Sequence, residues 1–171
     1  IAQIIRKLGG CAPEDVERVL VRCNRVVAND NADAKPTTLL GARLSMPFNL
    51  SLVLARGDVH TGDVTERDLH DERIRNNLGK VRLEADAAMP RFGSSVTLEL
   101  RDGRRGEATV LQPLGDPGTP LAWNDVIEKF GRLTRSVIPP GSVPAIAEVV
   151  EHIERADGRI LARMLHESVA A

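Results

Sequence analysis

The sequence predicts an α+β fold in which helices pack on one face of an antiparallel sheet. Three observations predict it. Apolar and polar residues alternate in short runs, apolar residues at helical spacing precede and follow these runs, and an Asp-Gly pair separates two of them. Alternation with a period of two is typical of strands buried on one face, and strands flanked by runs of helices favour an α+β class. We therefore expect a two-layer domain that ends in helices.

The chain opens on a predicted helix. Apolar residues recur at helical spacing from Ile1 to Leu8, and the glycine pair at 9–10 is typical of a helix end. No residue precedes Ile1 to cap this helix, and Ile1 is not a translation start. The opening therefore indicates a segment cut from a longer polypeptide.

The next elements are a predicted strand and a predicted buried helix. Alternating residues after Pro13 indicate a half-buried strand that reaches about Val27, and a polar loop follows over residues 29–36. Residues 45–56 are the most apolar run of the chain and favour a buried helix that stops at Gly57. Its cap is expected at Ser45 or Met46, with Pro47 in the first turn, where proline costs no backbone hydrogen bond.

The remaining chain is predicted to hold short surface helices, a hairpin and three further helices. One or two short helices are expected between Asp63 and Leu78. Alternation then indicates strands over residues 80–86, 96–101 and 108–110, with a turn at Asp102-Gly103 in which both residues have positive φ. A Gly/Pro-rich loop follows over residues 112–120. After it, apolar stripes predict three helices, over residues 126–137, 146–153 and 160–165.

Composition argues against several functions. The formal net charge is −1, from 23 Lys and Arg against 24 Asp and Glu, which leaves no electrostatic attraction to nucleic acid or an anionic membrane. Two cysteines without a CxxC spacing and four scattered histidines show no metal-ligand pattern. No apolar run approaches the roughly 18 residues that span a bilayer. We expect a cytoplasmic protein of 171 residues with no cofactor or metal, and no nucleic-acid or membrane partner.

The start of the 45–56 helix is the strongest candidate for a binding site. If Ser45 caps it, free backbone N–H groups and the positive end of the helix dipole point outward, beside the Ser45 hydroxyl and the Arg43 guanidinium. Such donors favour a carboxylate or a phosphate. The alternative is that Ser45 is only a cap and Arg43 only a surface residue.

Conventional catalytic signatures are missing from the sequence. It contains no Gly-x-Ser-x-Gly, Walker or dinucleotide-binding glycine pattern. His60 lies in the Gly/Asp-rich stretch 58–63 and is a candidate general base, although a lone loop histidine is more often a solvated side chain. His70 lies in a charged stretch and is interpreted as a surface residue.

Several short motifs follow one another in a specific order and spacing. They are Pro13-Glu14-Asp15-Val16-Glu17, Ala42-Arg43-Leu44-Ser45-Met46-Pro47-Phe48, the apolar helix closing on Gly57, Arg73 to Leu78, Lys80-Val81, Asp102-Gly103, Gly115 to Leu121, and Lys129-Phe130. In this order the segment resembles the C-terminal half of the 2-methylcitrate dehydratase (MmgE/PrpD) family. The resemblance covers nearly the whole chain.

The resemblance implies a two-domain enzyme more than twice this length, commonly a homodimer. A large helical domain, missing here, would join an α+β lid domain formed by residues 1–171, with the active site in the cleft between them. Members dehydrate 2-methylcitrate, decarboxylate cis-aconitate or epimerise iminodisuccinate without metal or iron–sulfur cluster. The resemblance thus implies a hydro-lyase, decarboxylase or epimerase whose substrate is a di- or tricarboxylic acid. Its catalytic histidines and lysine would lie upstream of Ile1.

The residue pattern and the resemblance meet at Arg43, Ser45 and Phe48, which are the predicted substrate-binding residues. Removal of a proton next to a carboxylate creates an enolate-like dianion that preorganised donors must hold. Several family members carry Tyr where this chain has Phe48, and a phenyl ring can pack on a substrate but cannot donate a hydrogen bond. The alternative function is a non-catalytic α+β module that binds a ligand or a protein partner.

Overall fold

The computed structural model describes residues 1–57 and 64–170 and divides the chain into two compact units. Unit 1 is Ile1–Asp116 and contains the sheet, whereas the described part of unit 2, Pro117–Ala171, is built from helices. The α+β class is therefore confirmed. The assignment of residues 1–171 to a single lid domain stays a prediction.

The sheet of unit 1 is mixed rather than wholly antiparallel. Its strand order is β2-β1-β3-β4, in which β1–β3 and β3–β4 are antiparallel and β1–β2 is parallel. The antiparallel expectation is therefore wrong for one pair. Alternation indicates which residues face the core but not the direction of the neighbouring strand, and the helices between β1 and β2 supply the crossover that a parallel pair needs. The strands are β1 (Val16–Cys23), β2 (Val81–Ala85), β3 (Ser94–Leu100) and β4 (Arg105–Val110).

The first strand ends four residues earlier than predicted. The Asn24 side chain accepts the N–H of Val26 at 3.0 Å and caps helix α2 (Arg25–Asp30), which replaces the end of the expected strand. An N-cap bond satisfies a donor that the first helical turn leaves without an intrahelical partner. The capping side chain of Asn24 therefore overrides the alternating pattern that continues to Val27.

The β3–β4 turn also differs from the prediction. Among the described residues positive φ occurs only at glycines, so Asp102 does not have it, while Gly103 has φ 88°. The Gly103 N–H donates to the Leu100 carbonyl at 3.0 Å. A wider four-residue turn with one left-handed glycine is a common alternative to the two-residue type I′ turn.

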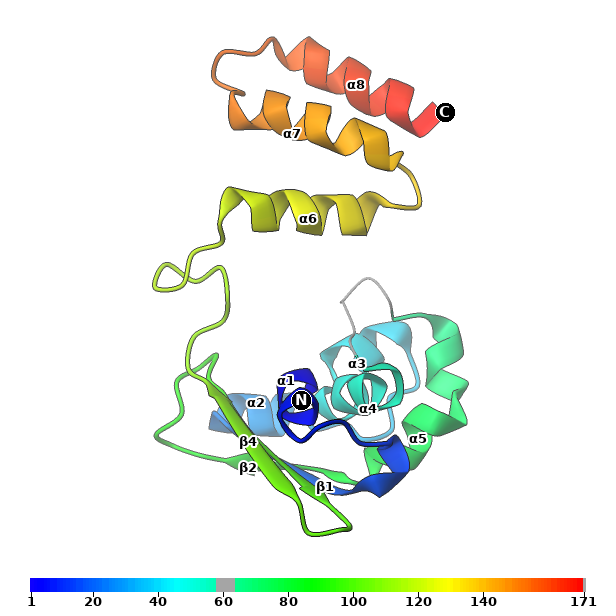
Figure 1. Cartoon of the computed structure of the whole chain (residues 1–171), viewed down its shortest axis with the longest axis vertical. Coiled ribbons are helices and arrows are strands. Elements are labelled where there is room, and N and C mark those ends of the chain that lie inside the picture. The colour runs from blue at the N-terminus through cyan, green and yellow to red at the C-terminus, as the bar shows by residue number, and fades with distance from the viewer. Residues whose placement is uncertain (58–63, 171) are drawn as a thin grey trace. The chain divides into compact units, whose positions relative to one another are not determined.

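Helices cover one face of the sheet (Figure 1). Helix α1 (Ala2–Lys7) packs on β4, α2 packs on β1 and β2, and α4 (Met46–Arg56) packs on β2. Helix α4 joins two apolar clusters, because its Leu54 packs in the sheet core while its Phe48 and Leu52 pack in the second cluster. The second cluster is completed by Ala42 of α3 (Leu39–Leu44), Val64, Leu69 of η3 (Glu66–His70) and Ile74 of α5 (Glu72–Leu78).

The helix predicted over residues 45–56 is confirmed, together with its cap, its proline and its closing glycine. Ser45 is the N-cap, Pro47 lies in the first turn, and Gly57 ends the helix with φ 90°. The short helices expected before Leu78 are also confirmed as η3 and α5. A further short turn of 3-10 helix, η1 (Pro13–Asp15), precedes β1.

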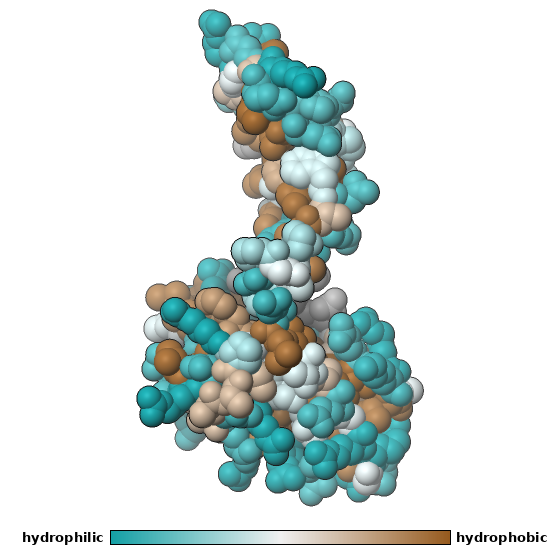
Figure 2. Space-filling view, turned by 90° about the vertical axis from the view of Figure 1, so that its left-hand side faces the viewer, coloured by the Kyte–Doolittle hydropathy of each residue, from teal (hydrophilic) through white to brown (hydrophobic). Residues whose placement is uncertain are grey.

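Unit 2 confirms the three C-terminal helices. They are α6 (Trp123–Thr134), α7 (Val143–Glu151) and α8 (Gly158–Ala170), with the short η4 (Pro140–Ser142) before α7. Ile138, Val143 and Ile146 form their small shared core. Apolar side chains also reach the surface of both units among polar ones (Figure 2).

A glycine in β4 allows α1 to lie close to the sheet. A Cβ at Gly106 would overlap Cγ2 of Ile4, which is fully buried, and would lie 3.3 Å from Cδ1 of Leu8. Gly106→Ala is therefore expected to destabilise unit 1 by about 1–2 kcal/mol, since extra volume in a packed core forces neighbouring side chains to shift. Hydrogen exchange of the β1 amides measures this loss.

Gly79→Ala is the matched control for that substitution. Gly79 has φ −68°, which alanine adopts easily, and a Cβ there meets nothing within 4 Å. We expect no loss of stability from this variant, because alanine reduces the entropy of the unfolded chain at a compatible position. Equal effects of the two substitutions would contradict the proposed close approach of α1 to β4.

Candidate functional site

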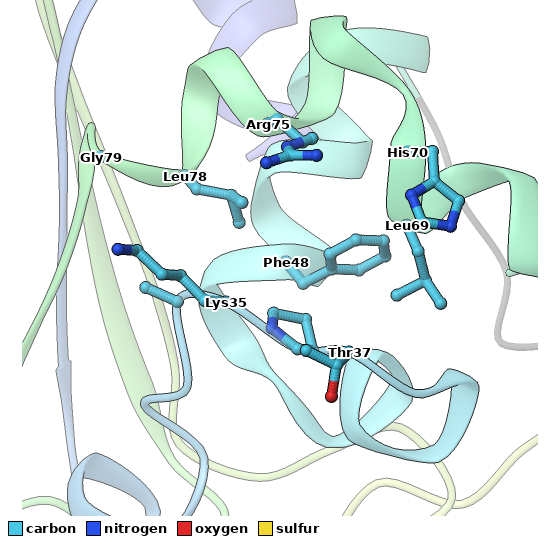
Figure 3. Close-up of a pocket in the computed structure, with 10 residues that line it drawn as sticks. Lys35, Thr37, Phe48, Leu69, His70, Arg75, Leu78 and Gly79 are labelled. Carbon is cyan, nitrogen blue, oxygen red and sulfur yellow. The ribbon is translucent and has the colours of Figure 1, made fainter.

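A cavity of about 520 Å³ opens beside the second apolar cluster of unit 1. Leu78 of α5, Leu69 of η3 and Phe48 from the first turn of α4 form its apolar floor (Figure 3). Phe48 is only 1% exposed, so it supports the floor from within the second apolar cluster. The loop before α3 supplies one wall, and η3 and α5 supply the other. The lining residues are Ala34, Lys35, Pro36, Thr37, Phe48, Leu69, His70, Arg75, Leu78 and Gly79.

Cationic and ionisable nitrogen groups surround this floor. Lys35 lies on the Gly79 side of the cavity, His70 lies on the opposite side, and Arg75 lies on the α5 wall (Figure 3). No Asp or Glu is among the lining residues within the described ranges 1–57 and 64–170. Within residues 1–57 and 64–170, neither Lys35 nor Arg75 forms an ion pair. The cavity therefore combines uncompensated positive charge with an apolar surface, which suits an organic anion.

Ser45 lies next to this cavity, but its hydroxyl is not available to a ligand. It is only 1% exposed, accepts the Phe48 N–H at 3.0 Å and donates to the carbonyl of Asp33. The remaining first-turn donors of α4 are also occupied. The Met46 N–H donates to the Asn31 carbonyl at 2.9 Å, and the Asn49 N–H donates to the Ser45 carbonyl.

The helix start therefore differs from the sequence-based prediction of an anion site. Pro47 has no N–H, and every other first-turn donor of α4 already has a protein partner. An anion needs donors that point into open space, and at this helix start there are none. The expectation that this N-terminus holds a carboxylate through its backbone is wrong, because the preceding loop folds over it.

The three predicted site residues occupy different places. Phe48 lines the cavity, Ser45 is buried under the adjoining loop, and Arg43 is exposed on α3 without lining the cavity. A role for Arg43 in substrate binding stays a prediction. His60 lies outside the described residues.

Sequence reasoning missed Lys35 and Arg75. It interpreted His70 as a surface residue, and His70 is indeed exposed, at the edge of the cavity that it lines. Forty residues separate Lys35 from Arg75, and neither belongs to a motif of known chemistry. Helix α5, which carries Arg75, packs against α4, and this packing places Arg75 and Lys35 beside the same cavity. No local signal identifies such a pair, because helix and strand periodicities report burial and not which surface residues converge.

A buried carboxylate supports the His70 wall. Asp68 of η3 is 2% exposed, pairs with the Arg56 side chain at the end of α4, and accepts the Thr65 N–H at 2.7 Å. Burial alone raises the pKa of this carboxyl, but the hydrogen bonds from Thr65 and Arg56 outweigh burial, so the pKa of Asp68 lies below its usual value. Asp68 thus fixes the position of η3 relative to α4.

Two further findings concern other kinds of site. Residues 1–57 and 64–170 contain no group of three or more His, Cys, Asp or Glu side chains placed to hold a metal ion. In the same part of the chain, no helix has the length and apolar character needed to cross a bilayer.

The fold and the cavity together define a mixed α+β domain with a partly apolar cavity that cationic side chains line. A family model described as the MmgE/PrpD C-terminal domain matches residues 1–155, and the chain belongs to the MmgE/PrpD family. The match includes the whole of unit 1 together with α6 and α7. No curated protein matches the chain in sequence.

Proposed function

We propose that this chain is the lid domain of a lyase or isomerase that acts on a di- or tricarboxylic acid, in the manner of 2-methylcitrate dehydratase. The cavity around Phe48 would hold the carboxylates of that acid. The observation that carries the proposal is the placement of Lys35, His70 and Arg75 around an apolar floor, with no carboxylate among the described lining residues. Membership of the MmgE/PrpD family supports the same class of substrate.

The cavity suits an acid with more than one carboxylate and a short carbon skeleton. Lys35 and Arg75 come from opposite walls, so separate carboxylates can each meet a cation while the half-buried Leu78 contacts the carbon skeleton. Phe48 is only 1% exposed and supports this apolar side from within the second apolar cluster. Arg can bind a carboxylate through two parallel N–H donors, whereas Lys acts as a point charge. These side chains would hold the charge that grows when a proton next to a carboxylate is removed.

The acid–base groups of the reaction would come from a helical domain that precedes this segment. Phe48 has no group that can donate or accept a proton. The chain in this proposal binds and orients the substrate, and its partner domain carries out the chemistry.

Cys11 and Cys23 are both free thiols, which supports a reducing compartment such as the cytoplasm.

Calorimetric titration of the chain with citrate tests the proposal. We expect saturable binding that weakens as salt concentration rises, because screening reduces the attraction between the carboxylates and the exposed cations. Triethyl citrate has the same skeleton without the charges and is expected not to bind. Equal binding of the ester, or no saturable heat with citrate, 2-methylcitrate and cis-aconitate, would overturn the carboxylate site.

A further inference from the structure

We propose that Ser45 is a positioning residue for the cavity and acts through Lys35. Its buried hydroxyl links the start of α4, which carries Phe48, to the rim segment, defined as residues 31–37, which carries Lys35. This inference rests on the proposed function of the cavity. It assigns Ser45 a role different from the direct substrate contact that the sequence predicts.

Three hydrogen bonds attach the rim segment to the α3–α4 junction. The Ser45 hydroxyl donates to the Asp33 carbonyl, and the Met46 N–H donates to the Asn31 carbonyl at 2.9 Å. The Asn31 side-chain amide donates to the Leu44 carbonyl at 2.7 Å. All three bonds are made before the chain reaches Lys35, so they determine where the cavity wall begins.

Asp33 connects the Ser45 hydroxyl to Lys35 through two hydrogen bonds. Its carbonyl accepts the Ser45 hydroxyl, while its side chain accepts the Lys35 N–H at 2.8 Å in a local turn. Residues 32–35 are exposed and belong to no helix or strand, so little apolar burial holds them in place. Polar contacts must then determine the backbone conformation that places Lys35 at the cavity wall.

The Ser45 hydroxyl bonds to both sides of this junction. It donates to the rim segment and accepts the Phe48 N–H at 3.0 Å. Phe48 is also held by the second apolar cluster, whereas the exposed rim segment has no such packing, so the loss of the hydroxyl affects Lys35. Ser45→Ala leaves the Asp33 carbonyl free to move away and removes the cap of α4. We expect citrate binding to weaken about fivefold, which corresponds to the loss of one ordinary intramolecular hydrogen bond.

Ser51→Ala is the matched control. Ser51 is a buried serine of the same helix, and its hydroxyl donates to the Pro47 carbonyl at 2.7 Å, within α4. This bond does not reach the rim segment. Citrate affinity is expected to stay unchanged in Ser51→Ala, so a general effect of truncating a buried serine in α4 would appear as equal losses in both variants.

A double-mutant cycle with Lys35→Ala separates positioning from a general loss of structure. If Ser45 acts through Lys35, then Ser45→Ala weakens citrate binding in the wild-type background and has no further effect in the Lys35→Ala background. An equal fold-change in both backgrounds would overturn the inference. If Ser45→Ala does not fold, Asn31→Ala takes its place, because it removes another of the three attachments and leaves the α4 cap intact.

The outcomes also separate this inference from the proposed function. Absence of citrate binding by the unaltered chain would refute the carboxylate site itself and the positioning role with it. Normal citrate binding by the unaltered chain and by Ser45→Ala alike would refute only the role of Ser45.

Discussion

Arg75→Glu is expected to weaken citrate binding about thirtyfold or more, because it removes a charge-assisted donor and places a carboxylate against the carboxylates of the ligand. Arg75 lines the cavity from α5, no described residue that lines the cavity with it is acidic, and it forms no ion pair within the described part of the chain. Titration calorimetry at a fixed ionic strength near 0.15 M measures the change; long-range effects of net charge are largely screened under these conditions.

Two further charge reversals show whether the effect belongs to the cavity. Arg82→Glu makes the same change of net charge on an exposed residue of β2 that does not line the cavity, and we expect it to leave citrate affinity nearly unchanged. Arg43→Glu tests the position that sequence reasoning favoured. A large loss of affinity in Arg43→Glu with none in Arg75→Glu would locate the site on α3 and contradict the cavity.

Asp68→Asn is expected to destabilise unit 1 by about 3 kcal/mol, since loss of one partner of a buried ion pair leaves charged and polar groups uncompensated. The substitution removes the charge that the Arg56 side chain and the Thr65 N–H now meet. Hydrogen exchange of the β1 amides again measures the stability of unit 1. The single Trp, Trp123, lies in unit 2, so its fluorescence does not report on this change.

The same carboxylate predicts a dependence on pH. The pKa of Asp68 in the folded chain lies below its usual value of 3.8, so its ionised form stabilises the fold fully above that value. This contribution is lost as pH falls through the lower, folded pKa. The stability difference between the wild type and Asp68→Asn should therefore be constant from neutral pH to about pH 5 and shrink below about pH 4.

Asp71→Asn is the matched control for the buried carboxylate. Asp71 is the N-cap of α5 and pairs with the exposed Arg73 side chain. Asn is as good an N-cap as Asp, and exposed ion pairs contribute little to stability, so we expect a much smaller loss than in Asp68→Asn. A loss in Asp71→Asn as large as that in Asp68→Asn would contradict the special role of burial at Asp68.

The helices were the most predictable part of the fold. Ser45, Pro47 and Gly57 mark the bounds of α4 by cap chemistry that acts within a few residues. The apolar stripes indicate that α6, α7 and α8 exist, but the observed helices begin two or three residues earlier than the stripes do. The strand boundary at Cys23 was less predictable, because a capping Asn and an alternating pattern compete at the same residues. The ordered motifs were also sufficient to indicate the family that the comparison shows.

The candidate site was mostly beyond sequence reasoning. Phe48 was predicted to bind substrate and lines the cavity, but its role stays a prediction, while Ser45 was assigned to a ligand although its hydroxyl is used within the protein. The mistake has a physical cause. A helix N-terminus can bind an anion only if its donors stay free, and whether a preceding loop folds over them depends on contacts such as that of Met46 with Asn31.

The sequence by itself determined the identity of most local elements, the α+β class and the family, because periodicity, caps and turn residues act over short separations. Only the tertiary structure decided that β2 pairs in parallel with β1 and that Lys35 and Arg75 line one cavity. It alone also showed that the Ile4 side chain packs directly on the backbone of Gly106. Each of these depends on contacts between residues far apart in the chain. Such contacts depend on how whole helices and strands pack together, and they produce no periodic pattern in the sequence around the residues that form them.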